Sequence, residues 1–94
     1  MPTLTASTRE AVQIAVLRSL NAVHPIGLIS GDLLTPVKIS TGQMQLTPTE
    51  LDSLLADMEE QGVVKSTPKK LNQAVLLWKR TEEGRAHLES LNLL

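Results

Sequence analysis

Basic side chains are concentrated near the C-terminal end of the chain, and no acidic residue separates them. They are Lys65, Lys69, Lys70, Lys79 and Arg80. Closely spaced positive charges neutralise phosphates, and a hairpin that carries them can lie on a nucleic-acid backbone or enter a minor groove. The amide side chains in the same stretch suit contacts with base edges. The candidate DNA-binding residues are therefore Lys65, Lys69, Lys70, Asn72 and Gln73. The alternative is that these lysines only keep the strand edges soluble.

Acidic side chains are concentrated just before this basic stretch. Residues 47–62 contain no Lys or Arg, and they include Glu50, Asp52, Asp57, Glu59 and Glu60. Phosphates repel such a surface, and among the bases only cytosine offers a donor that a carboxylate reads well. Contact between residues 47–62 and DNA is therefore disfavoured. The acidic and basic stretches could also pair across a subunit interface.

Residue types that carry catalysis or bind metal are scarce. The chain has no Cys and two histidines, His24 and His87, which lie far apart in the sequence. Glycines 27, 31 and 42 form neither a phosphate loop nor a dinucleotide fingerprint. Trp78 is the one aromatic residue, so a stacking platform for single strands is excluded. We expect no enzyme activity, no catalytic residues, no metal site and no cofactor.

Length and composition indicate one small folded unit. The chain has 94 residues, of which 41% are hydrophobic, and its net charge is −1. We expect a single domain over residues 1–94 with an aliphatic core. The N-terminus lacks the features of a signal peptide, and no apolar run approaches the roughly 20 residues that span a bilayer. A cytoplasmic protein without membrane contact is the expectation.

Capping signals and apolar spacing predict the helices. Ser7 and Glu10 form a capping-box pattern before a helix over about residues 7–23, which ends ahead of Pro25. Residues 26–29 are a minimal strand or coil. Ser30 is a plausible cap for a second helix, which Pro36 would leave short, kinked or broken. A third helix is predicted over residues 48–61, with Thr47 as cap and Gly62 as the left-handed terminator.

The C-terminal third predicts a hairpin and a last helix. Residues 63–67 and 74–80 favour β-structure and flank a proline-bearing polar stretch, so they indicate an antiparallel hairpin with a long loop over residues 68–73. Thr81 then caps a final helix, whose first turn contains Glu82 and Glu83.

Two stretches carry a resemblance to a known fold family. Residues 51–64, LDSLLADMEEQGVV, look like the third helix of winged helix-turn-helix domains, with a leucine pair and a Glu-x-x-Gly ending. Residues 78–85, WKRTEEGR, resemble the exit from the wing in MarR- and PadR-like regulators. Arg80 departs from the pattern, because these families usually have an aliphatic residue there. The resemblance implies an α+β winged helix with a three-helix core, a two-stranded hairpin wing and a C-terminal helix.

The resemblance implies a DNA-binding, transcription-regulator-like protein, and the charges place its contacts on the basic hairpin. The partners would be double-stranded DNA and a second copy of the chain. The alternative is a winged helix that binds a protein partner and no DNA. Apolar residues beside the core stripe of the first helix and in the last helix predict the homodimer interface, namely Ile14, Leu17, Leu88, Leu91 and Leu94.

Overall fold

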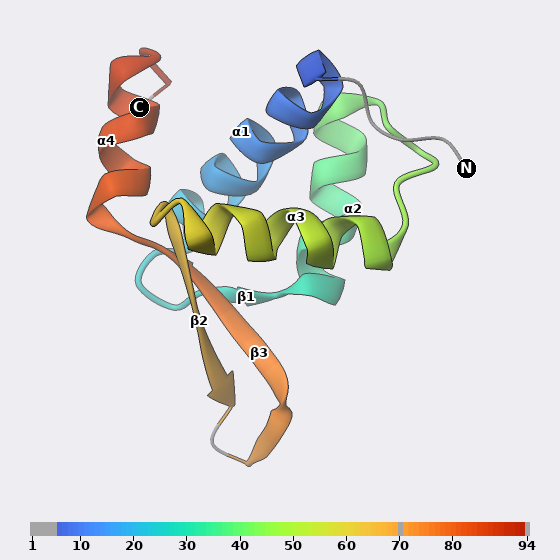
Figure 1. Cartoon of the computed structure of the whole chain (residues 1–94), viewed down its shortest axis with the longest axis vertical. Coiled ribbons are helices and arrows are strands. Elements are labelled where there is room, and N and C mark those ends of the chain that lie inside the picture. The colour runs from blue at the N-terminus through green and yellow to red at the C-terminus, as the bar shows by residue number, and fades with distance from the viewer. Residues whose placement is uncertain (1–5, 70, 94) are drawn as a thin grey trace.

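The computed structural model describes residues 6–69 and 71–93, and Figure 1 shows the arrangement of their helices and strands. In chain order these elements are α1 (Ala6–Val23), β1 (Leu28–Ile29), α2 (Ser30–Thr41), α3 (Pro48–Glu60), β2 (Val64–Lys69), β3 (Asn72–Arg80) and α4 (Glu82–Ser90). Helices α1, α2 and α3 lie together, and the β2–β3 hairpin projects away from them. The predicted α+β layout of a three-helix core, a wing and a C-terminal helix is confirmed.

The hairpin belongs to a three-stranded antiparallel sheet in the order β1-β3-β2. Strand β1 pairs with Leu77 and Trp78 of β3. The β2–β3 register shifts after Pro68, so that Lys69 faces Asn72. The predicted long loop over residues 68–73 is therefore wrong, since β2 continues to Lys69 and β3 already begins at Asn72. Proline is tolerated in β2 because it is an edge strand.

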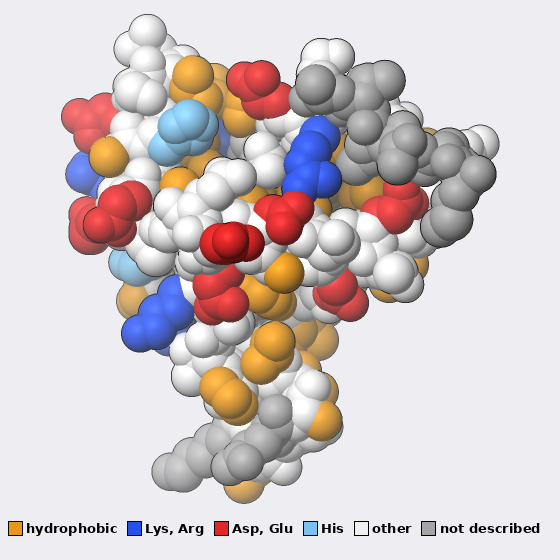
Figure 2. Space-filling model, viewed as in Figure 1, with side chains coloured by type: hydrophobic (Ala, Val, Ile, Leu, Met, Phe, Trp, Pro, Cys, Tyr) orange, Lys and Arg blue, Asp and Glu red, His pale blue; other side chains and the backbone are white. Residues whose placement is uncertain are grey.

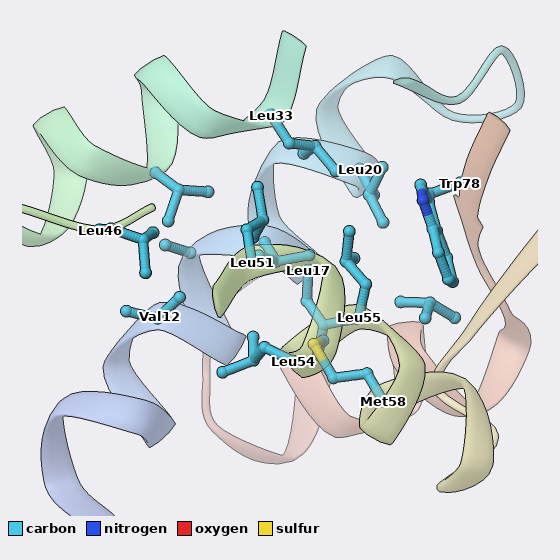
Figure 3. Packing of buried hydrophobic residues seen from close by; sticks show 14 of the residues in the cluster. Val12, Leu17, Leu20, Leu33, Leu46, Leu51, Leu54, Leu55, Met58 and Trp78 are labelled. Carbon is cyan, nitrogen blue, oxygen red and sulfur yellow. The ribbon is translucent and has the colours of Figure 1, made fainter. Parts of the chain in front are cut away.

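The core is built from aliphatic side chains of the helices together with Leu46, Val64 and Trp78 (Figure 3). Leu17 and Leu88 are 2% and 0% exposed and belong to this core. Both were predicted as dimer-interface residues, and their burial in the core of a single chain contradicts that prediction. The reason is that α4 packs against α1 and covers the side of α1 on which Leu17 lies.

Helix α2 continues through Pro36, although the sequence pattern predicted that it would be short, kinked or broken there. The buried side chains of Leu33 and Val37, on either side of the proline, fasten both halves to the core, and packing of this kind outweighs one lost backbone bond. Two predicted caps are wrong. Ser7 lies inside α1, and Ser30 is the first residue of α2, whose cap position is Ile29 without a side-chain bond.

Helix α3 confirms its predicted signals. The Thr47 hydroxyl oxygen accepts a bond from the Glu50 amide at 3.1 Å, and the Glu50 carboxylate accepts one from the Thr47 amide at 3.0 Å. Gly62 follows the helix with a φ of 83°. The helix ends at Glu60, one residue before the predicted end.

Helix α4 begins at the predicted cap. The Thr81 hydroxyl accepts a bond from the Gly84 amide at 3.1 Å and donates one to the Gly62 carbonyl at 2.6 Å. The Thr81 amide donates to the Val63 carbonyl at 3.1 Å. These bonds tie the start of α4 to the turn between α3 and β2. Over residues 6–69 and 71–93, no helix has the length and apolar character needed to cross a bilayer.

Candidate nucleic-acid interface

The hairpin β2–β3, called the wing below, has two chemically different faces. Residues directly opposite in an antiparallel pair share a face, and successive residues alternate between faces. Ser66 lies opposite Trp78, which is only 5% exposed, so their face is directed towards the helices. Lys65 lies opposite Lys79, on the other face. The two ammonium groups therefore belong to the side of the wing that is turned away from α3.

The pairing of Lys65 with Lys79 brings like charges together. Like charges directly opposite in a sheet destabilise it unless an anion is shared between them. Within the part of the chain that the structure describes, neither lysine forms an ion pair. Lys65 is exposed and Lys79 is half-buried, so both reach solvent at this face. The arrangement suits contact with a phosphate.

The outer end of the wing carries the other predicted DNA-binding residues. Lys69 and Asn72 are both exposed and lie opposite each other. Leu71 lies between them at the turn and is 98% exposed. Lys70 and the side chain of Gln73 lie outside the described residues.

Arg80 was counted with the basic residues of the wing, but its side chain is only 9% exposed. Its Nε donates a hydrogen bond to the Asn21 amide oxygen at 2.7 Å, and its guanidinium lies 3.7 Å from Glu82. Arg80 therefore links β3 to α1 and is not free for a phosphate. No sequence pattern indicates this contact, because Asn21 and Arg80 are far apart in the chain.

Besides Glu50 of the capping box, two acidic residues on α3 make bonds to other elements. Asp57 forms an ion pair with Arg9 of α1. The Glu59 carboxylate accepts bonds from the amide and the hydroxyl of Ser66 on β2, at 2.7 and 2.8 Å. Glu59 therefore fixes the base of the wing to α3, a role that the sequence pattern did not indicate. Figure 2 shows acidic side chains over α3 and apolar ones over the wing below it.

A groove lies between α3, the start of α2 and the wing. Its volume is about 490 Å³ and its lining is Ile29, Ser30, Gly31, Asp52, Ala56, Glu59, Ala74, Val75, Leu76 and Trp78. The lining contains two carboxylates and no Lys, Arg or His. A phosphate backbone is repelled from such a surface. The predicted weakness of α3 as a DNA contact thus extends to the groove beside it.

The candidate dimer residues are dispersed. Ile14 is half-buried and lines a cavity of about 170 Å³ that is also bounded by Glu10, Met58 and His87. Leu91 is 38% exposed, and Leu94 lies outside the described residues. Because Leu17 and Leu88 are buried in the core, the described residues among these candidates do not form a continuous apolar surface on α1 and α4.

Titratable side chains do not gather into a metal site in residues 6–69 and 71–93, where no three His, Asp or Glu lie close enough to hold an ion. His24 and His87 are both exposed.

The chain matches no protein-family model and no curated protein. It does resemble solved structures. MepR of S. aureus, solved in complex with DNA, has a TM-score of 0.72 at 18% identity, over 86% of this chain and 60% of MepR. YusO of Bacillus subtilis has a TM-score of 0.68 at 18% identity, over 87% and 57%. The transcriptional regulator PcaV of Streptomyces coelicolor, solved with its natural ligand, has a TM-score of 0.60 at 23% identity, over 79% and 46%.

These likenesses show the fold, a winged helix of the type found in MarR-family regulators. The match covers between 46% and 60% of the length of the three proteins.

Proposed function

We propose that this MarR-like winged helix is a DNA-binding transcription regulator whose DNA contact is made by the wing. The observation that carries the proposal is the pair Lys65 and Lys79, opposite each other on the solvent face of the hairpin without an ion-pair partner among the described residues. A phosphate placed between the two ammonium groups would relieve their repulsion. Lys69 adds an exposed positive charge near the tip of the wing.

The structural neighbours support the proposal at the level of fold. MepR was solved bound to DNA, and PcaV is described as a transcriptional regulator. A regulator of this kind would act as a homodimer in the cytoplasm and would not be an enzyme, and all three properties are part of the proposal.

The mode of binding follows from the charges. Because α3 presents Asp52 and Glu60 to solvent and has no Lys or Arg, reading of bases in the major groove is disfavoured. Contacts from the wing go to phosphates, which position a protein on DNA but carry no sequence information. Binding through three lysines should be weak, steeply salt-dependent and tolerant of sequence, with about −0.9 in log–log salt slope per lysine.

The test replaces Lys65 and Lys79 with alanine and measures fluorescence anisotropy of labelled duplex DNA over a salt series. We expect weaker binding and a salt slope reduced by about two phosphate contacts. The matched control is Arg18→Ala, which removes an exposed positive charge from α1 and should leave the slope unchanged. An equal loss in both variants would mean that overall charge, and not the wing, is responsible.

The opposite perturbation is reversal of the acidic face. Changing Asp52 and Glu60 to lysine should strengthen binding to all sequences, because both side chains are exposed on α3. Asp57 is unsuitable for this purpose, since its ion pair with Arg9 would be broken. Unchanged affinity in the double variant would contradict the claim that the acidic side chains of α3 repel DNA.

A second candidate function is a protein-interaction module. The groove between α3 and the wing favours it, because apolar side chains with two carboxylates and no basic group suit a protein segment better than a nucleic acid. If the protein does not bind DNA even at low salt, the protein-interaction module becomes the leading functional hypothesis.

A further inference from the structure

We propose that the groove between α3, the start of α2 and the wing binds an extended, basic segment of another protein. The segment pairs with the open edge of β3 and continues the sheet from the point where β1 ends. Such a partner gives the protein-interaction module a defined target, and its binding requires no contact with DNA. The open edge of β3, the charge of the groove and the space within it support this assignment.

One edge of β3 has no neighbouring strand over residues 72–76. In the sheet order β1-β3-β2, strand β3 is central, but β1 provides partners only for Leu77 and Trp78. Strand β1 stops at Ile29 because the chain enters α2 at Ser30. Within the described residues, the backbone of β3 from Leu76 outward therefore has no strand on the side of β1. Unpaired backbone groups at such an edge are a template for pairing with another chain.

The groove borders this open edge. Ala74, Val75 and Leu76 are consecutive residues of β3, and all three line the groove. Successive side chains of a strand point to opposite faces, so a run of three at one groove indicates that the strand edge borders it. Ile29, the last residue of β1, lines the groove as well. A segment in the groove is thus in line with β1 and beside the backbone of β3, as in recognition by strand addition.

The α3 side of the groove is acidic. Asp52, Ala56 and Glu59 line it, and their spacing of four and three residues places them in one stripe along α3. Asp52 is exposed, and both bonds that Glu59 accepts from Ser66 use its Oε2 atom. The lining contains no Lys, Arg or His, so the groove provides no cation of its own. A basic side chain of the partner supplies the complementary charge.

Small and apolar residues leave room for the side chains of the partner. Ala56 lies between the two carboxylates in the stripe on α3, and Gly31 has no atom within 4 Å of the position of a Cβ. The volume of about 490 Å³ falls within the range of binding pockets. Leu76, which is 39% exposed, and Trp78 supply apolar surface. The matching segment therefore carries apolar and basic side chains at alternate positions, so that they share the face turned into the groove.

The probe is a synthetic heptapeptide, blocked at both ends, in which threonine alternates with valine, arginine and valine. Occupancy of the groove is read from the fluorescence of Trp78, which lines the groove and is the only aromatic residue of the chain. The titration extends to about 1 mM peptide, because interfaces of this small size are weak. We expect saturable binding, and slower hydrogen exchange of the Ala74, Val75 and Leu76 amides in the complex, measured by NMR.

Two altered peptides separate charge from strand pairing. Glutamate in place of arginine should weaken binding by about tenfold or more, since it faces Asp52 and Glu59. Methylation of two consecutive backbone nitrogens should weaken it by a similar factor, because one of the two points at β3 in any register. Absence of binding by the arginine peptide up to about 1 mM would overturn the proposal. Equal binding of the methylated peptide would overturn it too.

Protein variants locate the contact. Asp52→Lys should weaken binding of the arginine peptide by about tenfold and strengthen binding of the glutamate peptide. The matched control is Glu60→Lys, the same charge change at an exposed position of α3 outside the groove lining, which should have little effect. An equal loss in both variants would assign the effect to overall charge and overturn the proposal.

The DNA contact is tested separately with Lys65→Ala and Lys79→Ala combined, because these lysines lie on the face of the wing opposite to Trp78. This double variant should bind the arginine peptide as wild type does, whether or not the wing binds DNA. Displacement of the peptide by duplex DNA would show that the groove binds nucleic acid and overturn the proposal. Self-association of wild type that Asp52→Lys abolishes would show that a second copy fills the groove, with the same consequence.

Discussion

Adding a methyl group at Gly84 tests how closely α4 packs against Val63 and Leu17. A Cβ at this position would lie 2.2 Å from the Val63 carbonyl oxygen and 3.1 Å from the Cδ2 atom of Leu17. The carbonyl is backbone and already accepts the Thr81 amide at 3.1 Å, so it cannot turn aside. Relief requires a shift of α4 by about 1 Å or more against the core, and overpacking of this kind costs about 1–3 kcal/mol and occasionally more. We expect Gly84→Ala to destabilise the fold by about 3 kcal/mol.

The matched control is Gly31→Ala in α2. Gly31 is exposed, and no atom lies within 4 Å of the position a Cβ would take. Alanine is the better helix former, so this variant should gain about 0.5–1 kcal/mol. Urea unfolding followed by circular dichroism measures both changes. A Gly84→Ala protein as stable as wild type would refute the close contact between α4 and Val63.

Three further predictions concern the helices that carry the wing. Leu54→Ala should cost about 2–5 kcal/mol in urea unfolding, because Leu54 is 1% exposed; a loss under about 1 kcal/mol would contradict the phase of α3. Thr47→Ala should cost about 1 kcal/mol by removing the capping box, and equal stability would contradict that cap. Glu59→Ala should speed hydrogen exchange of the Ser66 amide, measured by NMR, because that amide loses its acceptor; unchanged exchange would contradict the link between α3 and the wing.

Local signals in the sequence predicted the starts of α3 and α4 correctly, although the local signals at Ser7 and Ser30 did not produce the predicted caps. The capping box of Thr47 and Glu50 spans three positions, and Thr81 reaches Gly84 over the same distance. Gly62 ends α3 because its backbone adopts a positive φ. Such interactions depend on neighbours in the chain, so spacing alone identifies them.

Other errors arose where distant parts of the chain meet. The burial of Leu17 depends on α4, which covers it and meets α1 only in the folded molecule. Continuity of α2 through Pro36 depends on core packing on both sides of the proline.

In the candidate site, too, the sequence predicted the local features and missed the contacts between separate elements. The sequence identified the basic wing and the acidic α3. It could not identify that Arg80 binds Asn21, or that Glu59 binds Ser66, because each bond joins separate elements.

The most direct measurement of the central claim is binding of the wild-type protein to random duplex DNA, followed by fluorescence anisotropy from about 50 to 200 mM salt. Contacts from Lys65, Lys69 and Lys79 predict binding at the low end that falls with a log–log slope of about −3, with little dependence on sequence. No binding at about 50 mM salt, where phosphate contacts are strongest, would contradict DNA recognition by the wing.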